Sequence, residues 1–170
     1  STFIDALSCF YVSNAIRKAR GDNKVHSMLI HPSQKKIDHK LVKEKADKIL
    51  TNWRAIALLG TGDFAYINDL KPVLIKAYNM YKLEGVLLRP FIDYEKEILN
   101  CISKSSDVLI FNSDSINARS DASHFNTRIY LGGNILDRGI TIKGLAITYI
   151  IRRAQGYSTL DNTEQRARWF

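Results

Sequence analysis

The chain has 170 residues, of which 45% are hydrophobic and 25% are charged. This composition is typical of one globular domain, taken here as residues 1–170, and excludes a disordered tail, a collagen-like rod and a membrane-spanning chain. Lysine and arginine total 25 against 17 aspartates and glutamates, and the net charge of +8 favours a polyanionic partner.

The positive charge is uneven along the chain. Residues 24–54 carry 8 basic and 3 acidic side chains, a net +5, and residues 138–170 carry 6 and 2, a net +4. The two cysteines, Cys9 and Cys101, cannot form a disulfide framework, and no secretory signal pattern is visible. We therefore expect buried thiols in a cytoplasmic protein without membrane association.

The first third of the chain predicts a helix, a strand and a second helix. Apolar residues recur at three- and four-residue steps over residues 3–20, and Gly21 is a suitable stop. An apolar run over residues 25–31, closed by Pro32, predicts a buried strand. Helical periodicity resumes from residue 36 to about 53, with a strongly basic outer face.

The rest of the chain changes from helical to strand periodicity. Residues 65–81 are helix-like, but Pro72 must start or kink a helix there. Asp93 is a suitable N-cap for a short helix that ends near Cys101. Three β-rich runs and a terminal helix follow, at residues 108–111, 128–131, 145–151 and from Asp161 onward. Strands that alternate with helices favour a three-layer α/β domain with a mostly parallel sheet.

A glycine-rich stretch directly follows the predicted strand 128–131. Glycines at the carboxyl end of a strand let the backbone approach a ligand, and open α/β sheets bind ligands at that edge. The residues of this stretch that we expect to contact a ligand are Gly133, Asn134, Arg138, Gly139 and Thr141.

Basic residues mark the end of the chain as a second candidate. Gln165 and Arg168 share one helical face at positions i and i+3. An arginine there offers a planar pair of donors to a phosphate group. Arg152 and Arg153 directly follow the predicted strand 145–151.

In this order the segments resemble the second RecA-like lobe of superfamily-two helicases and translocases. Arg138-Gly139-Ile140-Thr141 is similar to the fifth motif of that superfamily, and Gln165 with Arg168 is similar to the sixth. More closely, the chain resembles the Z-one domain family, a helicase-like family of bacterial and phage proteins named as endonucleases. The resemblance covers nearly the whole chain and rests on Gly-Gly-Asn, Arg-Gly, Arg-Arg and Gln-Arg-x-Arg-Trp-Phe pieces in sequence.

The resemblance implies a RecA-like lobe with a mainly parallel sheet and extra helices, from a larger DNA-dependent ATPase of restriction, phage defence or DNA processing. ATP and Mg²⁺ would be held mostly by the N-terminal lobe of the same protein. Arg168 would reach the γ-phosphate, and Gln165 would couple that site to the fifth-motif loop. A nuclease or methyltransferase would be a further partner, and the residues implied to contact DNA are Thr141, Arg152, Arg153 and Lys43.

Two absences limit what this chain does alone. No G-x-x-x-x-G-K-[ST] loop occurs, so we do not expect the isolated chain to hydrolyse ATP. The histidines lack metal-ligand spacing, so we expect no metal site, and we assign no nuclease chemistry. On this reading residues 1–21 belong to the domain or to the linker from the other lobe.

Two other functions stay open from the residues alone. One is a non-catalytic module that binds protein or nucleic acid, in which the basic surface only adds solubility or weak affinity. The more remote one is a dinucleotide-binding domain, because Gly60 to Ala65 matches G-x-G-x-x-A and Glu84 lies roughly 20 residues further on. Pro72 interrupts the helix that this fingerprint needs.

Overall fold

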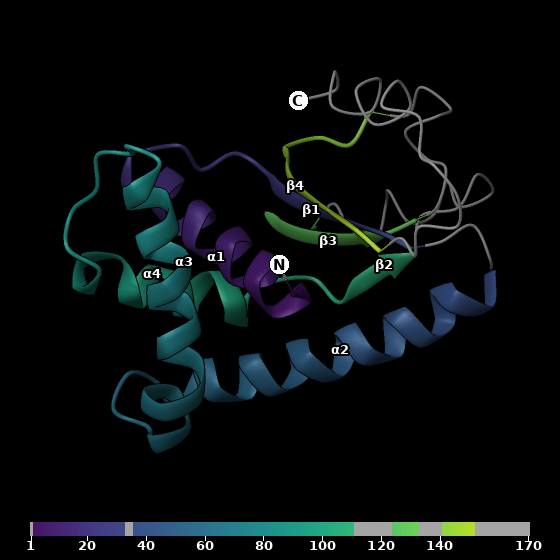
Figure 1. Ribbon diagram of the computed structural model, residues 1–170, viewed down its shortest axis with the longest axis horizontal. Helices are drawn as coiled ribbons and strands as arrows, with labels where there is room; N and C mark the ends of the chain where they lie inside the picture. The colour runs from purple at the N-terminus through teal and green to yellow at the C-terminus, as the bar shows by residue number, and fades with distance from the viewer. Residues whose placement is uncertain (1, 33–35, 111–123, 133–140, 152–170) are drawn as a thin grey trace.

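The computed structural model describes residues 2–32, 36–110, 124–132 and 141–151 (Figure 1). No helix in these ranges is both long and apolar enough to cross a bilayer. The elements in chain order are α1 (Phe3–Ala19), β1 (His26–His31), α2 (Lys36–Leu59), the π-helix η1 (Tyr66–Leu70), α3 (Lys71–Leu83), α4 (Ile92–Ser103), β2 (Val108–Ile110), β3 (Thr127–Leu131) and β4 (Leu145–Ile150).

The four described strands form one parallel sheet in the order β2-β3-β1-β4. β1 is central, and all six of its residues are buried. It pairs with β3 from His26 opposite Thr127 and with β4 from Ser27 opposite Leu145. The predicted α/β class, the parallel sheet and the positions of the strands are therefore confirmed.

α1 and α2 contact the sheet, whereas α3 packs against α1, and α4 packs against α1 and α2 (Figure 1). The strand register places Met28 beside Ile129 and Ile147, and these side chains pack with the buried residues of every helix. Leu29, on the opposite face, does not belong to that cluster although it is fully buried. A three-layer domain needs helices on both faces, and the described residues supply one helical layer (Figure 1).

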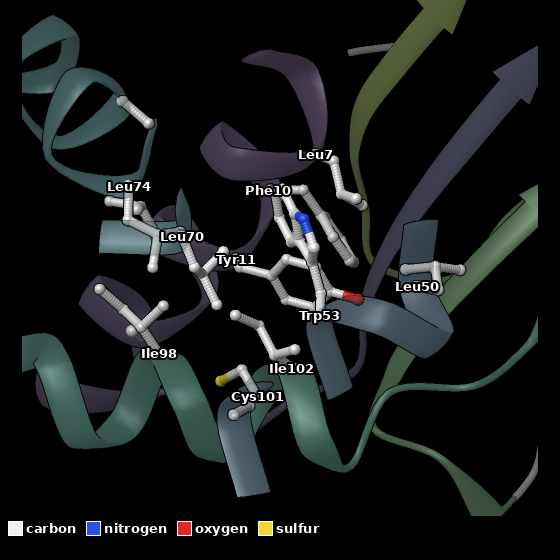
Figure 2. Packing of buried hydrophobic residues seen from close by; sticks show 14 of the residues in the cluster. Leu7, Phe10, Tyr11, Leu50, Trp53, Leu70, Leu74, Ile98, Cys101 and Ile102 are labelled. Atoms are coloured by element: carbon white, nitrogen blue, oxygen red, sulfur yellow. The ribbon is translucent and has the colours of Figure 1, made fainter. Parts of the chain in front are cut away.

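α1 is a core helix of this layer. It starts with a capping box in which Thr2 and Asp5 bond to each other's backbone N–H groups. Tyr11 then packs against Trp53 of α2, with 6.1 Å between the ring centroids (Figure 2). Its hydroxyl donates to the Ser105 hydroxyl at 2.9 Å. Asn14 donates to the Thr127 hydroxyl at 2.8 Å at the start of β3.

α2 is longer than its periodicity predicts and ends at Leu59 rather than near Trp53. Ile56 and Ala57 extend its buried stripe into the same core. The dinucleotide alternative is therefore wrong, because its fingerprint needs a strand directly before Gly60 and the structure has the last turn of a helix there.

The structure confirms the predicted start of one helix at Pro72 and corrects the predicted N-cap of the next. Pro72 stands in the first turn of α3, where its missing N–H costs no hydrogen bond, and η1 precedes it. α4 begins after Phe91, so Asp93 lies in the first turn of the helix rather than at its N-cap. A carboxylate there still favours the positive end of the helix dipole.

Candidate functional site

The carboxyl edge of the sheet holds the residues that directly precede two of the predicted ligand-binding segments. The Gly132 N–H, directly after β3, donates to the Ile30 carbonyl at 3.1 Å. The Ile151 N–H, directly after β4, donates to the His31 carbonyl at 2.8 Å. Gly132 and Ile151 therefore lie on opposite sides of the end of β1, one residue before Gly133 and Arg152 respectively.

Most of the predicted site residues lie outside the part of the chain that the structure describes. These residues are Gly133, Asn134, Arg138, Gly139, Arg152, Arg153, Gln165 and Arg168. The terminal helix predicted from Asp161 also lies outside it.

His31 is the described side chain at the centre of this edge. It is the last residue of β1, and its exposed fraction is 4%. The sequence predicts no metal site at the histidines, and position in the fold is the signal that distinguishes His31 from the others. A polar residue that ends the central strand of a parallel sheet stands where such sheets bind ligands.

Thr141 approaches the sheet from its other edge. It is exposed and lies three residues before Gly144, whose carbonyl accepts the Ser27 N–H at 2.7 Å where β4 begins. β3 has five residues, so the two edges are about 17 Å apart. Gly132 and Gly144 thus lie at opposite edges of the sheet.

Lys43 is partly exposed and paired with a carboxylate of its own helix. Its ammonium forms an ion pair with Asp47 one turn along α2, and Asp47 also accepts the Val108 N–H at 3.1 Å. Exposed lysines of α2 without an ion pair among the described residues are Lys40, Lys45 and Lys48. A helical projection of residues 36–59 separates these positions from the buried stripe, so the sequence already carried this signal.

A Ser13–His26 pair beneath α1 is the nearest approach to a catalytic dyad among the described residues. The Arg17 guanidinium lies 2.5 Å from His26 Nδ1, which must therefore accept, leaving the proton on Nε2. Nε2 then donates to the Ser13 hydroxyl at 2.9 Å, and that hydroxyl donates to the Phe10 carbonyl. A nucleophilic serine needs the reverse arrangement, because its base must accept the hydroxyl proton.

The environment of His26 indicates that its role is structural. The imidazole stacks on the Phe10 ring, with 4.9 Å between centroids, and is almost fully buried. Burial and the nearby Arg17 charge lower the pKa of His26 to about 4. The ring is therefore neutral at pH 7 and serves to join α1 to the start of β1.

The described residues do not form a metal centre. In those ranges, no three or more His, Cys, Asp or Glu side chains are grouped closely enough to hold a metal ion. The carboxylates with the closest contacts are instead neutralised by cations, as Glu95 is by Lys71 at 2.9 Å.

Comparison with known protein families yields a match over almost the whole chain. The family model described as the Z1 domain matches residues 2–170, which is almost the whole chain. No curated protein and no solved structure matches significantly.

Proposed function

This chain belongs to the Z1 domain family, and we propose that it is a RecA-like lobe of a nucleic-acid-dependent ATPase whose nucleotide site is completed by another lobe. The observation that carries the proposal is the convergence of Gly132 and Ile151 on the end of β1. The glycine-rich stretch and the Arg-Arg segment start directly after these two positions, at the edge where parallel α/β sheets bind ligands.

In this proposal the chain contributes to the chemistry through its arginines. Arg168 stabilises the charge that develops on the γ-phosphate during transfer to water, and Gln165 links that site to the fifth-motif-like loop. The sequence has no phosphate loop, and the described residues offer no carboxylate cluster suited to Mg²⁺. We therefore assign nucleotide and metal binding mainly to the other lobe and derive no step through the metal in this chain.

Nucleic acid is the proposed activator because the surface charge of the chain is positive and unevenly distributed. The +5 of residues 24–54 falls largely on α2, whose exposed lysines contact solvent. Phosphate contacts of this kind give affinity with little sequence preference. Closure of two lobes on ATP, promoted by nucleic acid, would make hydrolysis conditional on the polymer. Restriction, phage defence or DNA processing in the cytoplasm are the proposed settings.

The test is DNA-stimulated ATP hydrolysis by the intact parent protein, measured beside the 170-residue chain alone. We expect stimulated turnover in the parent and none in the isolated chain. Hydrolysis by the isolated chain would overturn the divided site. A parent that binds DNA but never hydrolyses ATP would favour a non-catalytic nucleic-acid-binding module, for which the missing phosphate loop is the supporting observation.

A further inference from the structure

The outward side of α2 combines positive charge with apolar surface along one line. From residue 45 to residue 59 the exposed positions are Lys45, Lys48, Thr51, Asn52, Ala55, Leu58 and Leu59, and we call them the outer face of α2. None of them is acidic, although the exposed Glu44 directly precedes Lys45. Asp47, the carboxylate in this range, is half-buried and bonds inward to Lys43 and Val108. Figure 1 shows α2 along the lower edge of the molecule with the sheet on its inner side.

An exposed aromatic residue follows the end of α2 after a short turn. Leu58 and Leu59 are 77% and 66% exposed, and Phe64 is 79% exposed. A turn closed by the Asp63 N–H and the Gly60 carbonyl joins Phe64 to the end of α2. The Asp63 carboxylate accepts the N–H groups of Ala65 and Tyr66, so it caps the next helical segment.

The spacing of charge and apolar surface restricts the kind of partner. Lys48 and Leu59 are eleven residues apart on a continuous helix, which is about 17 Å along its axis. A partner that contacts the whole outer face must present negative charge at one end and a flat apolar surface at the other. The polar Thr51 and Asn52 between them require a partner that also forms hydrogen bonds.

We propose that the outer face of α2, together with Phe64, is a binding track for single-stranded nucleic acid. Phosphates would contact Lys45 and Lys48, and an unpaired base would stack on Phe64 beside Leu59. A duplex offers the same phosphates but keeps its bases stacked inside. This inference rests on the proposed nucleic-acid-dependent ATPase and specifies the strand state and the surface that it uses.

Other partners fit the outer face less well. A helix that lies in a membrane surface carries apolar residues along its whole length and basic residues at its flanks. Here Lys48, Asn52, Ala55 and Leu59 follow one another on a single line. A protein partner would bury an apolar centre with a polar rim, whereas the centre of this face is Thr51 and Asn52.

The test is binding of the 170-residue chain to a fluorescent oligothymidine, to a labelled duplex of the same length and to phosphatidylserine vesicles, across a salt series. Lys45→Gln with Lys48→Gln should lower the slope of log affinity against log salt by about 1.4, at about 0.7 per phosphate contact. The matched control is Lys82→Gln with Lys96→Gln, which removes the same charge from exposed sites on α3 and α4.

The aromatic contact has its own variants. Phe64→Ala should weaken oligothymidine binding about 5-fold or more and leave duplex binding unchanged. Phe64→Trp should retain oligothymidine binding, because its ring also stacks on a base. Leu87→Ala, at another exposed apolar position, is the control. All these positions are on the surface, and unchanged thermal unfolding midpoints would confirm that each variant folds.

Four outcomes would overturn the track. The first is an equal decrease of the salt slope in the Lys82→Gln, Lys96→Gln control, and the second is duplex bound as tightly as oligothymidine. The third is an unchanged oligothymidine affinity in Phe64→Ala. The fourth is vesicle binding that depends on Phe64 while oligothymidine binding does not. The ATPase assay on the parent protein is read separately. DNA-stimulated hydrolysis that persists in the α2 variants would reject the track and keep the proposed function, whereas a parent without stimulation would reject the function itself.

Discussion

The carbonyl oxygen of Val25 lies where a side chain at position 144 would begin. Gly144 has a φ of +69°, and a Cβ built on it would stand 2.0 Å from that oxygen. The contact joins the turn before β4 to the start of β1, where Ser27 donates its N–H to Gly144 and its hydroxyl to the Lys143 carbonyl. This position therefore requires glycine both for its backbone angle and for its close approach.

Gly144→Ala should lower the free energy of unfolding by about 3 kcal/mol or more, because strain at positive φ adds to a backbone clash. Gly62→Ala is the control, since nothing lies within 4 Å of its Cβ position and its φ is not positive. We expect a change within about 0.5 kcal/mol there. Urea unfolding at pH 7 measures both, and equal stability of the two variants would contradict the contact.

Stability should fall in mild acid because of His26. Its pKa is about 4 in the folded protein against 6.5 when unfolded, so the unfolded chain binds more protons between these values. The contribution of His26 is complete above pH 6.5 and is lost as the pH falls toward 4. Between pH 7 and pH 5 we expect a loss of about 2 kcal/mol.

His26→Gln isolates this effect, because glutamine retains a donor and an acceptor but does not titrate. The free energy of unfolding should depend less on pH in this variant over the same range, whatever its absolute stability. Parallel pH profiles for the two proteins would show that His26 is not the titrating group.

The ion pair with Lys71 should stabilise the buried negative charge of Glu95. The Glu95 carboxylate is 4% exposed, accepts the Tyr66 hydroxyl at 2.6 Å and pairs with Lys71 at 2.9 Å. Lys71→Met leaves a buried negative charge with one hydrogen bond, and we expect a loss of about 2 kcal/mol, below the full buried-pair effect because Lys71 is partly exposed.

Lys76→Met provides the comparison for that ion pair. Lys76 pairs with Asp5 at 2.7 Å, but its side chain is 64% exposed, and such surface pairs contribute about 0–1 kcal/mol. Thermal or urea unfolding of both variants measures the difference. A larger loss of unfolding free energy in Lys76→Met than in Lys71→Met would contradict the expectation that Glu95 depends more on its lysine partner than Asp5 does.

Arg168→Ala in the intact parent protein should slow ATP turnover roughly 100-fold or more, because an arginine that stabilises the transition state is often worth about 10³. Nucleotide binding should be largely retained. Single-turnover hydrolysis and equilibrium binding of a fluorescent ATP analogue separate the two effects. Full turnover in this variant would remove Arg168 from the proposed mechanism.

Local sequence patterns predicted most of the helices and strands of this protein. The features that these patterns did not predict depend on contacts between residues far apart in the sequence. The β-rich runs marked the strands because they are apolar and β-branched, as in Leu145 to Ile150. The strand order was not predictable from these runs, since each partner of β1 lies about 100 residues or more away. The end of α2 was predicted about six residues too early, because the burial of Ile56 and Ala57 depends on the packed core of the whole domain.

The candidate site divides in the same way. The sequence alone identified the glycine-rich stretch after β3, because glycines directly after a strand let the backbone approach a ligand. It could not reveal that Gly132 and Gly144 mark opposite edges of the sheet, since that depends on hydrogen bonds to Ile30 and Ser27. The hydrogen-bond partners of His26 were equally hidden, because Ser13 and Arg17 come from a separate helix.

The central position of β1 has a consequence for how the chain folds. His26 pairs with Thr127, 101 residues later, and Ser27 pairs with Leu145, 118 residues later. At a synthesis rate of about 5–20 residues per second, a wholly buried strand leaves the ribosome at least about 5 s before its first partner. Contacts of such sequence separation also make folding slow. During that interval α1 and α2 are the neighbours in sequence able to shield β1 from other chains.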